Sequence, residues 1–323
     1  MSESELPEVL EEDEDVEEGE QEEGEEKPEE NVLADDVIGE CLSLLEKIGD
    51  GLAYTYIRLD CSNRELTNIS ILERYIHLRI IDVSNNQLSS LSPLDYLPNL
   101  LSLKADRNII ENVDIKPHAF LQYISMNNNK IEEISEGMSH PLVRHIDLAG
   151  NRIKELSQLN EENYPKLAIL KLQENAIETI KDINLPSLTS LSLGHNKMTD
   201  FQWISNLVNL EFLEINNNSI DRLDGFNDNM KKLKYIDLKE NIVDELSEVE
   251  KLTCLPALTI LLLTDNPVSK EPDFRVEVLS FLPTLITLNY SDITEEERGE
   301  AYEVLKERQE AQNTQKEEIP LPP

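Results

Sequence analysis

The chain has 323 residues, of which 66 are acidic and 29 are basic, so its formal net charge at pH 7 is -37. This acidic excess argues against a nucleic-acid partner, because phosphate binding needs clusters of basic side chains. No apolar run approaches the roughly 20 residues of a membrane-spanning helix, so we expect no membrane partner either.

Residues 1–30 are the most acidic stretch. They contain 17 acidic side chains against the single basic Lys27. A segment with so little apolar surface cannot offset the entropy lost on ordering, so we expect a disordered acidic tail. The acidic run also differs from the basic and then apolar pattern of a secretory signal, which predicts a cytoplasmic chain with reduced cysteines.

Residues 31–51 carry the apolar pattern of an amphipathic helix. Asp35 or Asp36 can cap the start of such a helix, and Gly49 can end it. The apolar positions that share one helix face are Ile38, Cys41, Leu42, Leu45 and Ile48. We therefore predict an N-terminal helical cap over residues 31–51.

Residues 52–268 repeat one motif. The stretch from Leu188 to Met198 fits the template L-x-x-L-x-L-x-x-N-x-L, and the frame recurs every 21 to 25 residues. Tyr56, Leu59 and Cys61 begin a weaker first unit in which Arg64 replaces the asparagine. The motif predicts about ten leucine-rich repeats, each with a short parallel strand followed by a short 3₁₀ or helical segment on the convex side. The fold class is therefore α/β, a leucine-rich repeat solenoid.

Nine asparagines occupy the same position in successive repeats. They are Asn86, Asn108, Asn129, Asn151, Asn175, Asn196, Asn218, Asn241 and Asn266. A buried amide must find hydrogen-bond partners, since an unpaired polar group costs roughly 1 to 3 kcal/mol. We expect these amides to stack as a structural ladder that bonds the backbone of adjacent turns.

The strand positions between the core leucines should face solvent on the concave side, since successive side chains of a strand point to opposite faces. Several of these positions are aromatic or apolar, which is typical of residues that anchor protein interfaces. The predicted partner-binding residues are Tyr123, His145, Ile169, Phe212, Tyr235, Ile260 and Leu262. The alternative is that these side chains only pack along a curved sheet.

The repeats give way to a different pattern after Asn266. Phe274, Val278 and Leu282 have helical spacing, so we predict a C-terminal cap over residues 269–290. Residues 291–323 follow as a polar helix and a loose tail. A capping-box spacing begins at Thr294, and Tyr302 and Leu305 offer a second possible docking site on the helix.

The sequence contains no pattern of an active site. The five histidines lack ligand spacing, and the ten glycines never form a phosphate-binding loop. The three cysteines, Cys41, Cys61 and Cys254, are spaced as small core residues rather than as metal ligands. We expect a non-enzyme with no cofactor, no metal and no small-molecule substrate.

Segments outside the repeat framework resemble a known family. The closing unit from Phe274 to Asn289 is similar to that of the short-repeat subfamily of leucine-rich repeat proteins, which includes phosphatase regulators. Residues 42–45, 74–79, 103–106, 137–141 and 183–186, together with the acidic N-terminus, resemble the radial-spoke leucine-rich repeat proteins of motile cilia and sperm flagella. The resemblance implies a structural protein of the axoneme whose partners are radial spoke head subunits.

Three functions stay open at this point, because a fold does not determine a function. The first is the radial-spoke scaffold. The second is a targeting subunit of a protein phosphatase, which co-purification with the phosphatase would support. The third is an acidic histone-binding protein, although in that family the acidic run follows the repeats and here it precedes them.

Overall fold

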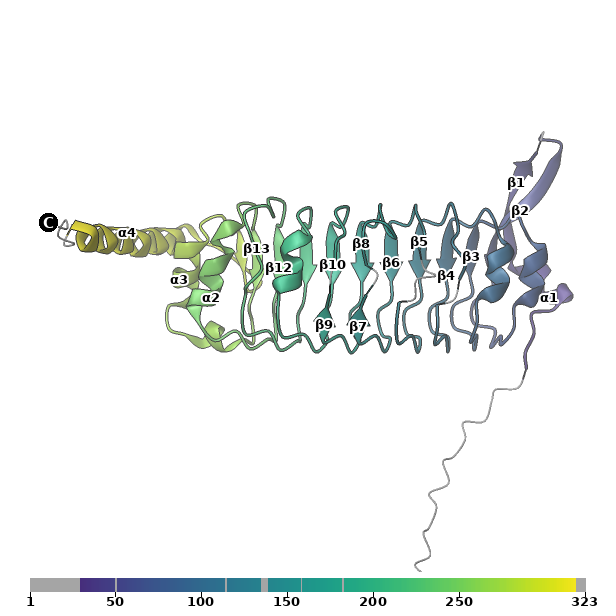
Figure 1. The fold of residues 1–323 in the computed structure, drawn as a ribbon, viewed down its shortest axis with the longest axis horizontal. Coiled ribbons are helices and arrows are strands. Elements are labelled where there is room, and N and C mark those ends of the chain that lie inside the picture. Colours follow the sequence, from purple (N-terminus) through teal and green to yellow (C-terminus); the bar gives the residue numbers. More distant parts are fainter. Residues whose placement is uncertain are drawn as a thin grey trace, which may run out of the picture.

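The computed structural model describes residues 30–49, 51–113, 115–134, 139–157, 159–181 and 183–317. It is an elongated solenoid in which thirteen strands lie side by side in one sheet (Figure 1). This confirms the predicted leucine-rich repeat solenoid. The predicted acidic tail lies outside the described residues, apart from Glu30.

The main sheet is parallel except at its two ends, where β1 and β15 run antiparallel to their neighbours. Its strands are β1 (Leu42–Ile48), β2 (Ala53–Asp60), β3 (Ile80–Asp82), β4 (Ser102–Lys104), β5 (Tyr123–Ser125), β6 (His145–Asp147), β8 (Ile169–Lys171), β10 (Ser190–Ser192), β11 (Phe212–Glu214), β12 (Tyr235–Asp237), β13 (Ile260–Leu262), β14 (Thr287–Leu288) and β15 (Ser291–Asp292). Neighbouring repeats pair in register, so equivalent positions form straight rows across the sheet.

Two rows of apolar residues from the strands form the core. The first row runs from Leu59 to Leu261 and the second from Cys61 to Leu263, one residue from each repeat. All of these side chains are at most 1 % exposed, because stacking of adjacent repeats covers each row from both sides.

The convex side is built from short segments. It carries 3₁₀ turns at Ser70–Arg74, Ser92–Tyr96, Gln202–Asn206, Lys251–Cys254 and Pro267–Lys270, and the helix α2 (Leu246–Glu250). The middle repeats differ from the prediction of 3₁₀ or brief helix. There β7 (Glu155–Leu156) and β9 (Thr179–Ile180) pair as a second, two-stranded parallel sheet. Only Thr179 and Ile180 are β-branched residues that favour a strand.

The asparagine ladder is continuous from Asn86 to Asn266. Asn151 is representative, because its Nδ2 donates to the carbonyl oxygens of Leu148 (2.9 Å) and of Met126 in the preceding repeat (3.0 Å). Its Oδ1 accepts a hydrogen bond from the backbone N–H of Ile131, also at 3.0 Å. Each asparagine thus ties its own turn to the preceding one.

The residue before every ladder asparagine has a left-handed backbone. These residues are Asn85, Arg107, Asn128, Gly150, Glu174, His195, Asn217, Glu240 and Asp265, with φ between 52° and 66°. The turn needs this conformation to direct the asparagine inward. Only one of the nine is glycine, so the ladder imposes a backbone strain that the repeats sustain collectively.

The N-terminal cap differs from the prediction. The helix α1 (Asp35–Cys41) buries Ile38 and Cys41, but it ends there. Residues 42–48 instead form β1, which pairs with β2, and Leu45 is 58 % exposed rather than buried. The prediction of one helix through Ile48 is therefore wrong. The aromatic and β-branched residues of β2 offer a strand partner, and the left-handed Gly49 and Gly51 make the turn.

The C-terminal end is closed by helices α3 (Phe274–Phe281) and α4 (Glu295–Glu317). The expected capping box is present, since the Thr294 N–H donates to Glu297 Oε2 at 2.8 Å and the Glu297 N–H donates to Thr294 Oγ1 at 3.2 Å. The Nε of Arg275 donates to Glu297 at 2.6 Å, which holds the pKa of Glu297 down at about 2. These bonds hold the start of α4 against α3, and Arg308 further along α4 donates to Ser280 Oγ of α3 at 2.7 Å. The last part of α4 extends beyond the solenoid (Figure 1).

Candidate protein-binding face

The sequence-predicted concave residues fall into two groups. Tyr123, His145 and Ile169 are paired in register on β5, β6 and β8. The second group begins two strands later, where Phe212, Tyr235 and Ile260 are paired on β11, β12 and β13. Ser190 on β10 separates the groups, so the concave face carries two patches rather than one stripe.

The second group contains the most exposed of the seven predicted concave residues. Phe212 is 46 % exposed, whereas Tyr235 and Ile260 are half-buried. The rings of Phe212 and Tyr235 have centroids 6.4 Å apart and are tilted by 40°, a favourable arrangement for an aromatic pair. Burial raises the pKa of Tyr235 to about 12, and nearby Asp237, Glu214 and Tyr290 add to the shift. The hydroxyl is therefore neutral and available as a donor at physiological pH.

Leu262 was predicted to face solvent, and that prediction is wrong. It is only 2 % exposed. The C-terminal cap adds β14 and β15 beside β13, and the left-handed Asn289 and Tyr290 turn the chain back between them. This hairpin comes after the last full repeat, so the repeat template could not predict that it would cover Leu262.

The same hairpin brings an aromatic residue that sequence reasoning missed. Asn289 and Tyr290 both have positive φ, as the central residues of a type I′ turn require. The Tyr290 side chain is 64 % exposed, and its phenol lies close enough to Tyr235 and Lys239 to influence their pKa values. We refer to Phe212, Tyr235, Ile260 and Tyr290 as the C-terminal aromatic cluster.

The first group is more buried than the second. The rings of Tyr123 and His145 have centroids 4.8 Å apart, and both side chains are half-buried, as is Ile169. Burial lowers the pKa of His145, and nearby Lys171 adds to the shift, so this imidazole is neutral at physiological pH. The charges beside this group are balanced, because Lys171 lies 3.9 Å from Asp147.

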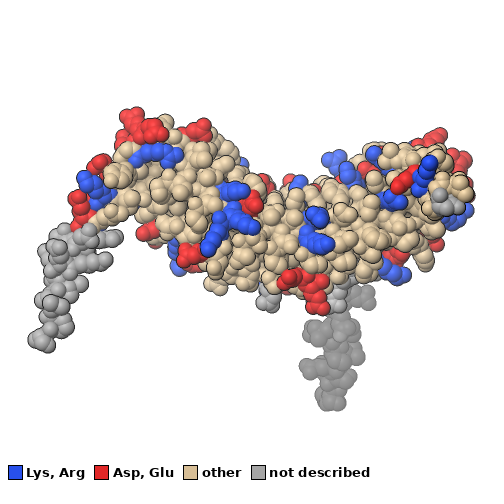
Figure 2. Space-filling model, turned by 90° about the horizontal axis from the view of Figure 1, so that it is seen from above, with Lys and Arg blue, Asp and Glu red and all other residues tan. Residues whose placement is uncertain are grey.

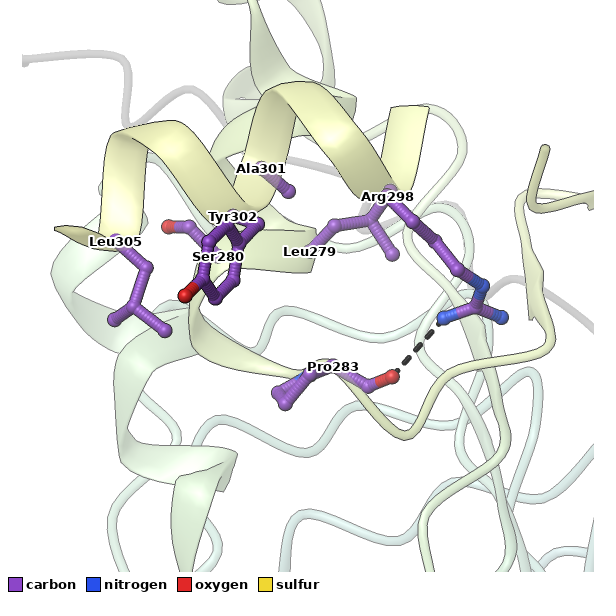
Figure 3. Close-up of a pocket in the computed structure, with 7 residues that line it drawn as sticks. All are labelled: Leu279, Ser280, Pro283, Arg298, Ala301, Tyr302 and Leu305. Atoms are coloured by element: carbon purple, nitrogen blue, oxygen red, sulfur yellow. Dashed lines mark hydrogen bonds between the residues drawn. The ribbon is translucent and has the colours of Figure 1, made fainter. Parts of the chain in front are cut away.

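The predicted docking site on α4 borders a shallow groove of about 150 Å³. Figure 3 shows Tyr302 and Leu305 along one side of this groove and Pro283 opposite them, with Leu279 and Ser280 of α3 behind. Arg298 donates to the carbonyl of Pro283 at 3.0 Å and closes one end. Tyr302 is 64 % exposed, so the groove is a second surface on which a partner could bind.

Metal, membrane and nucleic-acid binding each require a particular structural feature. Among the described residues, no three His, Cys, Asp or Glu side chains are arranged to hold a metal ion. Over the same part of the chain, no helix combines the length and the apolar character needed to cross a membrane. On the face shown in Figure 2, the described basic side chains lie in small separate groups among acidic ones, rather than in the continuous band typical of nucleic-acid binding.

The cysteines are free thiols. Cys41 and Cys61 are buried, as expected, while Cys254 is only partly buried. Burial raises the pKa of Cys61, with the adjacent Cys41 thiol adding to the shift, so Cys61 stays protonated and unreactive.

Comparison with known proteins agrees with the leucine-rich repeat fold of the chain. Two leucine-rich repeat family models match residues 77–112 and 188–318. Leucine-rich repeat-containing protein 23 of Bos taurus is 40% identical over 272 residues, which cover 84% of this chain and 79% of that protein. The protein of the same name from Homo sapiens is 41% identical over 276 residues, covering 85% and 80%.

Among solved structures, the functional domain of InlJ from Listeria monocytogenes is similar in fold. It superposes with a TM-score of 0.58 at 25% sequence identity, over 71% of this chain and 47% of that one.

Proposed function

The chain belongs to the leucine-rich repeat-containing protein 23 family, and from this we propose that it is a non-catalytic scaffold in the radial spokes of motile cilia and sperm flagella. The observation that carries the proposal is the identity of about 40% over 84% of the chain, since it extends far beyond the repeat framework. We further propose that its partners are radial spoke head subunits and that it is located in the axoneme.

The concave face is the surface we propose for partner binding. Exposed aromatic side chains in register can enter pockets of a partner, and such residues contribute most to interface affinity. Phe212 and Tyr235 fit this role, because their side chains lie outside the core rows. Their removal should therefore weaken binding without unfolding the solenoid.

A capture experiment tests both parts of the proposal. The purified chain would be used to bind spoke head subunits from flagellar extract, identified by mass spectrometry. Replacing Phe212 and Tyr235 together by alanine should reduce affinity by about 2 kcal/mol, or ~30-fold. A matched variant with Phe120 and Tyr96 changed to alanine removes two exposed aromatic residues outside the concave strands and should bind normally.

The groove beside α4 is the competing surface. If Tyr302→Ala with Leu305→Ala abolishes capture while the concave variant binds normally, the contact is α4 and not the concave face. Cross-linking mass spectrometry on isolated axonemes tests the location separately. Absence of cross-links to any spoke protein, or capture of a phosphatase or of histones instead, would contradict the radial-spoke proposal.

A further inference from the structure

Two acidic side chains adjoin the C-terminal aromatic cluster. Glu214 and Asp237 are the last residues of β11 and β12, and they stand directly opposite each other in the register. Like charges held at adjacent positions repel each other. Neither residue belongs to the core rows, so the packing of the core does not require two acidic side chains at these positions.

The hydrogen-bond partners of both carboxylates are neutral. Glu214 Oε2 accepts from the Ser192 hydroxyl at 2.7 Å, and Asp237 Oδ1 accepts from the Lys239 backbone N–H at 3.0 Å. The Lys239 ammonium instead forms an ion pair with Glu240 at 3.1 Å. Three carboxylates therefore face one cation.

The neighbouring strands and turns supply little positive charge to balance these carboxylates. On β10 the position next to Glu214 is Ser192, and on β13 the position next to Asp237 is Leu262, both uncharged. His195, in the turn after β10, lies close enough to influence the pKa of Glu240. Burial raises the pKa of Asp237, and Glu214 and Glu240 add to the shift while the Lys239 N–H and ammonium oppose it. At this end of the concave face, the carboxylates of Glu214, Asp237 and Glu240 thus outnumber the basic groups that influence them, Lys239 and His195.

The aromatic cluster lies beside these carboxylates. Phe212 precedes Glu214 by two residues on β11, and Tyr235 precedes Asp237 by two on β12, so each ring and carboxylate share a face of the sheet. The electron-rich face of an aromatic ring attracts a cation within about 6 Å of its centroid. A guanidinium group can stack on a ring and bridge two carboxylates at once, which a compact ammonium group does less well.

We propose that the C-terminal aromatic cluster binds an arginine side chain of a partner polypeptide, whose charge is received by Glu214 and Asp237. This inference rests on the proposed function and specifies the chemistry of the partner. Apolar residues beside the arginine would cover the exposed ring of Phe212 and the half-buried Ile260. The group of Tyr123, His145 and Ile169 lacks this property, because Lys171 already balances Asp147 there.

The test uses two synthetic peptides that carry a fluorescent label. One has a single arginine flanked by leucines, and the other has citrulline at that position, which keeps the shape and removes the charge. Fluorescence anisotropy with the full chain should show at least about 10-fold tighter binding of the arginine peptide. Equal affinities, or no binding of either peptide up to millimolar protein, would overturn the proposal.

Variants test whether the preference for the arginine peptide depends on Glu214 and Asp237. Glu214→Gln combined with Asp237→Asn should make the two affinities equal. Asp82→Asn is a matched control, because Asp82 Oδ1 accepts the Ser84 N–H at 3.0 Å in the same turn geometry as Asp237. The positions two residues before the row of Asp82 are Arg58, Ile80 and Ser102, none of which is aromatic. A thermal melt of each variant verifies folding. A preference that survives in the double variant would also overturn the proposal.

The outcome is separable from that of the proposed function. If capture of spoke head subunits needs Phe212 and Tyr235 but is unchanged by the two neutralising substitutions, the concave face binds its partner and the arginine inference alone is wrong.

Discussion

Replacing a central ladder asparagine should destabilise the solenoid by an amount that follows from its hydrogen bonds. Asn151→Leu removes the amide with little change in volume. The carbonyls of Met126 and Leu148 each keep a second donor, from Asn129 and Asn175 respectively, both at 3.0 Å. The ladder is therefore interlocked, and neither carbonyl loses its last partner.

The backbone N–H of Ile131 is the group that becomes unpaired. It donates to Asn151 Oδ1 at 3.0 Å in a buried environment, and no other acceptor for it is present among the described residues. An orphaned buried donor costs roughly 1 to 3 kcal/mol, and two weakened carbonyl interactions add to this, so we expect a loss of about 2 to 3 kcal/mol. Urea unfolding should show a lower midpoint with an unchanged slope.

Hydrogen exchange gives a site-specific measure of the same effect. Exchange of the Ile131 amide should accelerate more than that of other amides in the repeat. Asn112→Leu is the control, because Asn112 is an exposed asparagine outside the ladder. An unchanged unfolding midpoint for Asn151→Leu, together with unchanged exchange at Ile131, would refute the ladder's contribution to stability.

Three further predictions concern the ends, the buried histidine and the glycines. Deleting residues 1–29 should leave the unfolding midpoint unchanged, whereas deleting residues 1–51 removes α1 and β1 and should cause aggregation detectable by light scattering. His140 is fully buried with its pKa lowered to about 4, chiefly by burial. Below about pH 6.5 the unfolded chain therefore binds a proton at His140, whereas the folded chain binds it only below about pH 4. The free energy of unfolding should fall as the pH is lowered from about 6.5 to about 4, and His140→Leu should flatten that part of a plot of urea midpoint against pH. Gly225 has φ of 111°, and an added Cβ would lie 2.4 Å from a backbone oxygen, so Gly225→Ala should lower the free energy of unfolding by about 2 kcal/mol or more. Gly39 lies in α1, and an added Cβ there would meet nothing within 4 Å, so Gly39→Ala should be neutral or stabilising by up to about 1 kcal/mol.

The sequence predicted the features that repetition encodes. The two core rows, the ladder positions and the in-register concave rows all follow from one template applied ten times, because each repeat imposes the same alternation on its strand. The C-terminal capping box at Thr294 was predictable for the same kind of reason, since it depends only on residues within one helical turn.

The features that the sequence did not predict depend on contacts between distant segments. Residues 42–48 have the spacing of a helix, yet they form a strand, because β2 offers an antiparallel partner that no local pattern reveals. Leu262 has the register of an exposed residue, yet the terminal hairpin covers it. In both cases a contact with another segment of the chain overrides the local preference. Both contacts lie at an end of the solenoid, where the regular repeats stop.

The concave cluster shows why a site is harder to predict here than the fold. The leucine positions and the asparagine of each repeat specify the solenoid, and they leave the concave positions unconstrained, so Ser190 and Phe212 are equally compatible with it. Register then brings Phe212 beside Tyr235 and Glu214 beside Asp237, although each pair is separated by 23 residues in the chain. The template fixes which positions become neighbours, and the residues at those positions determine the chemistry. Two like charges directly opposite each other on neighbouring strands weaken the sheet slightly at that point, so their presence is better explained by binding than by folding.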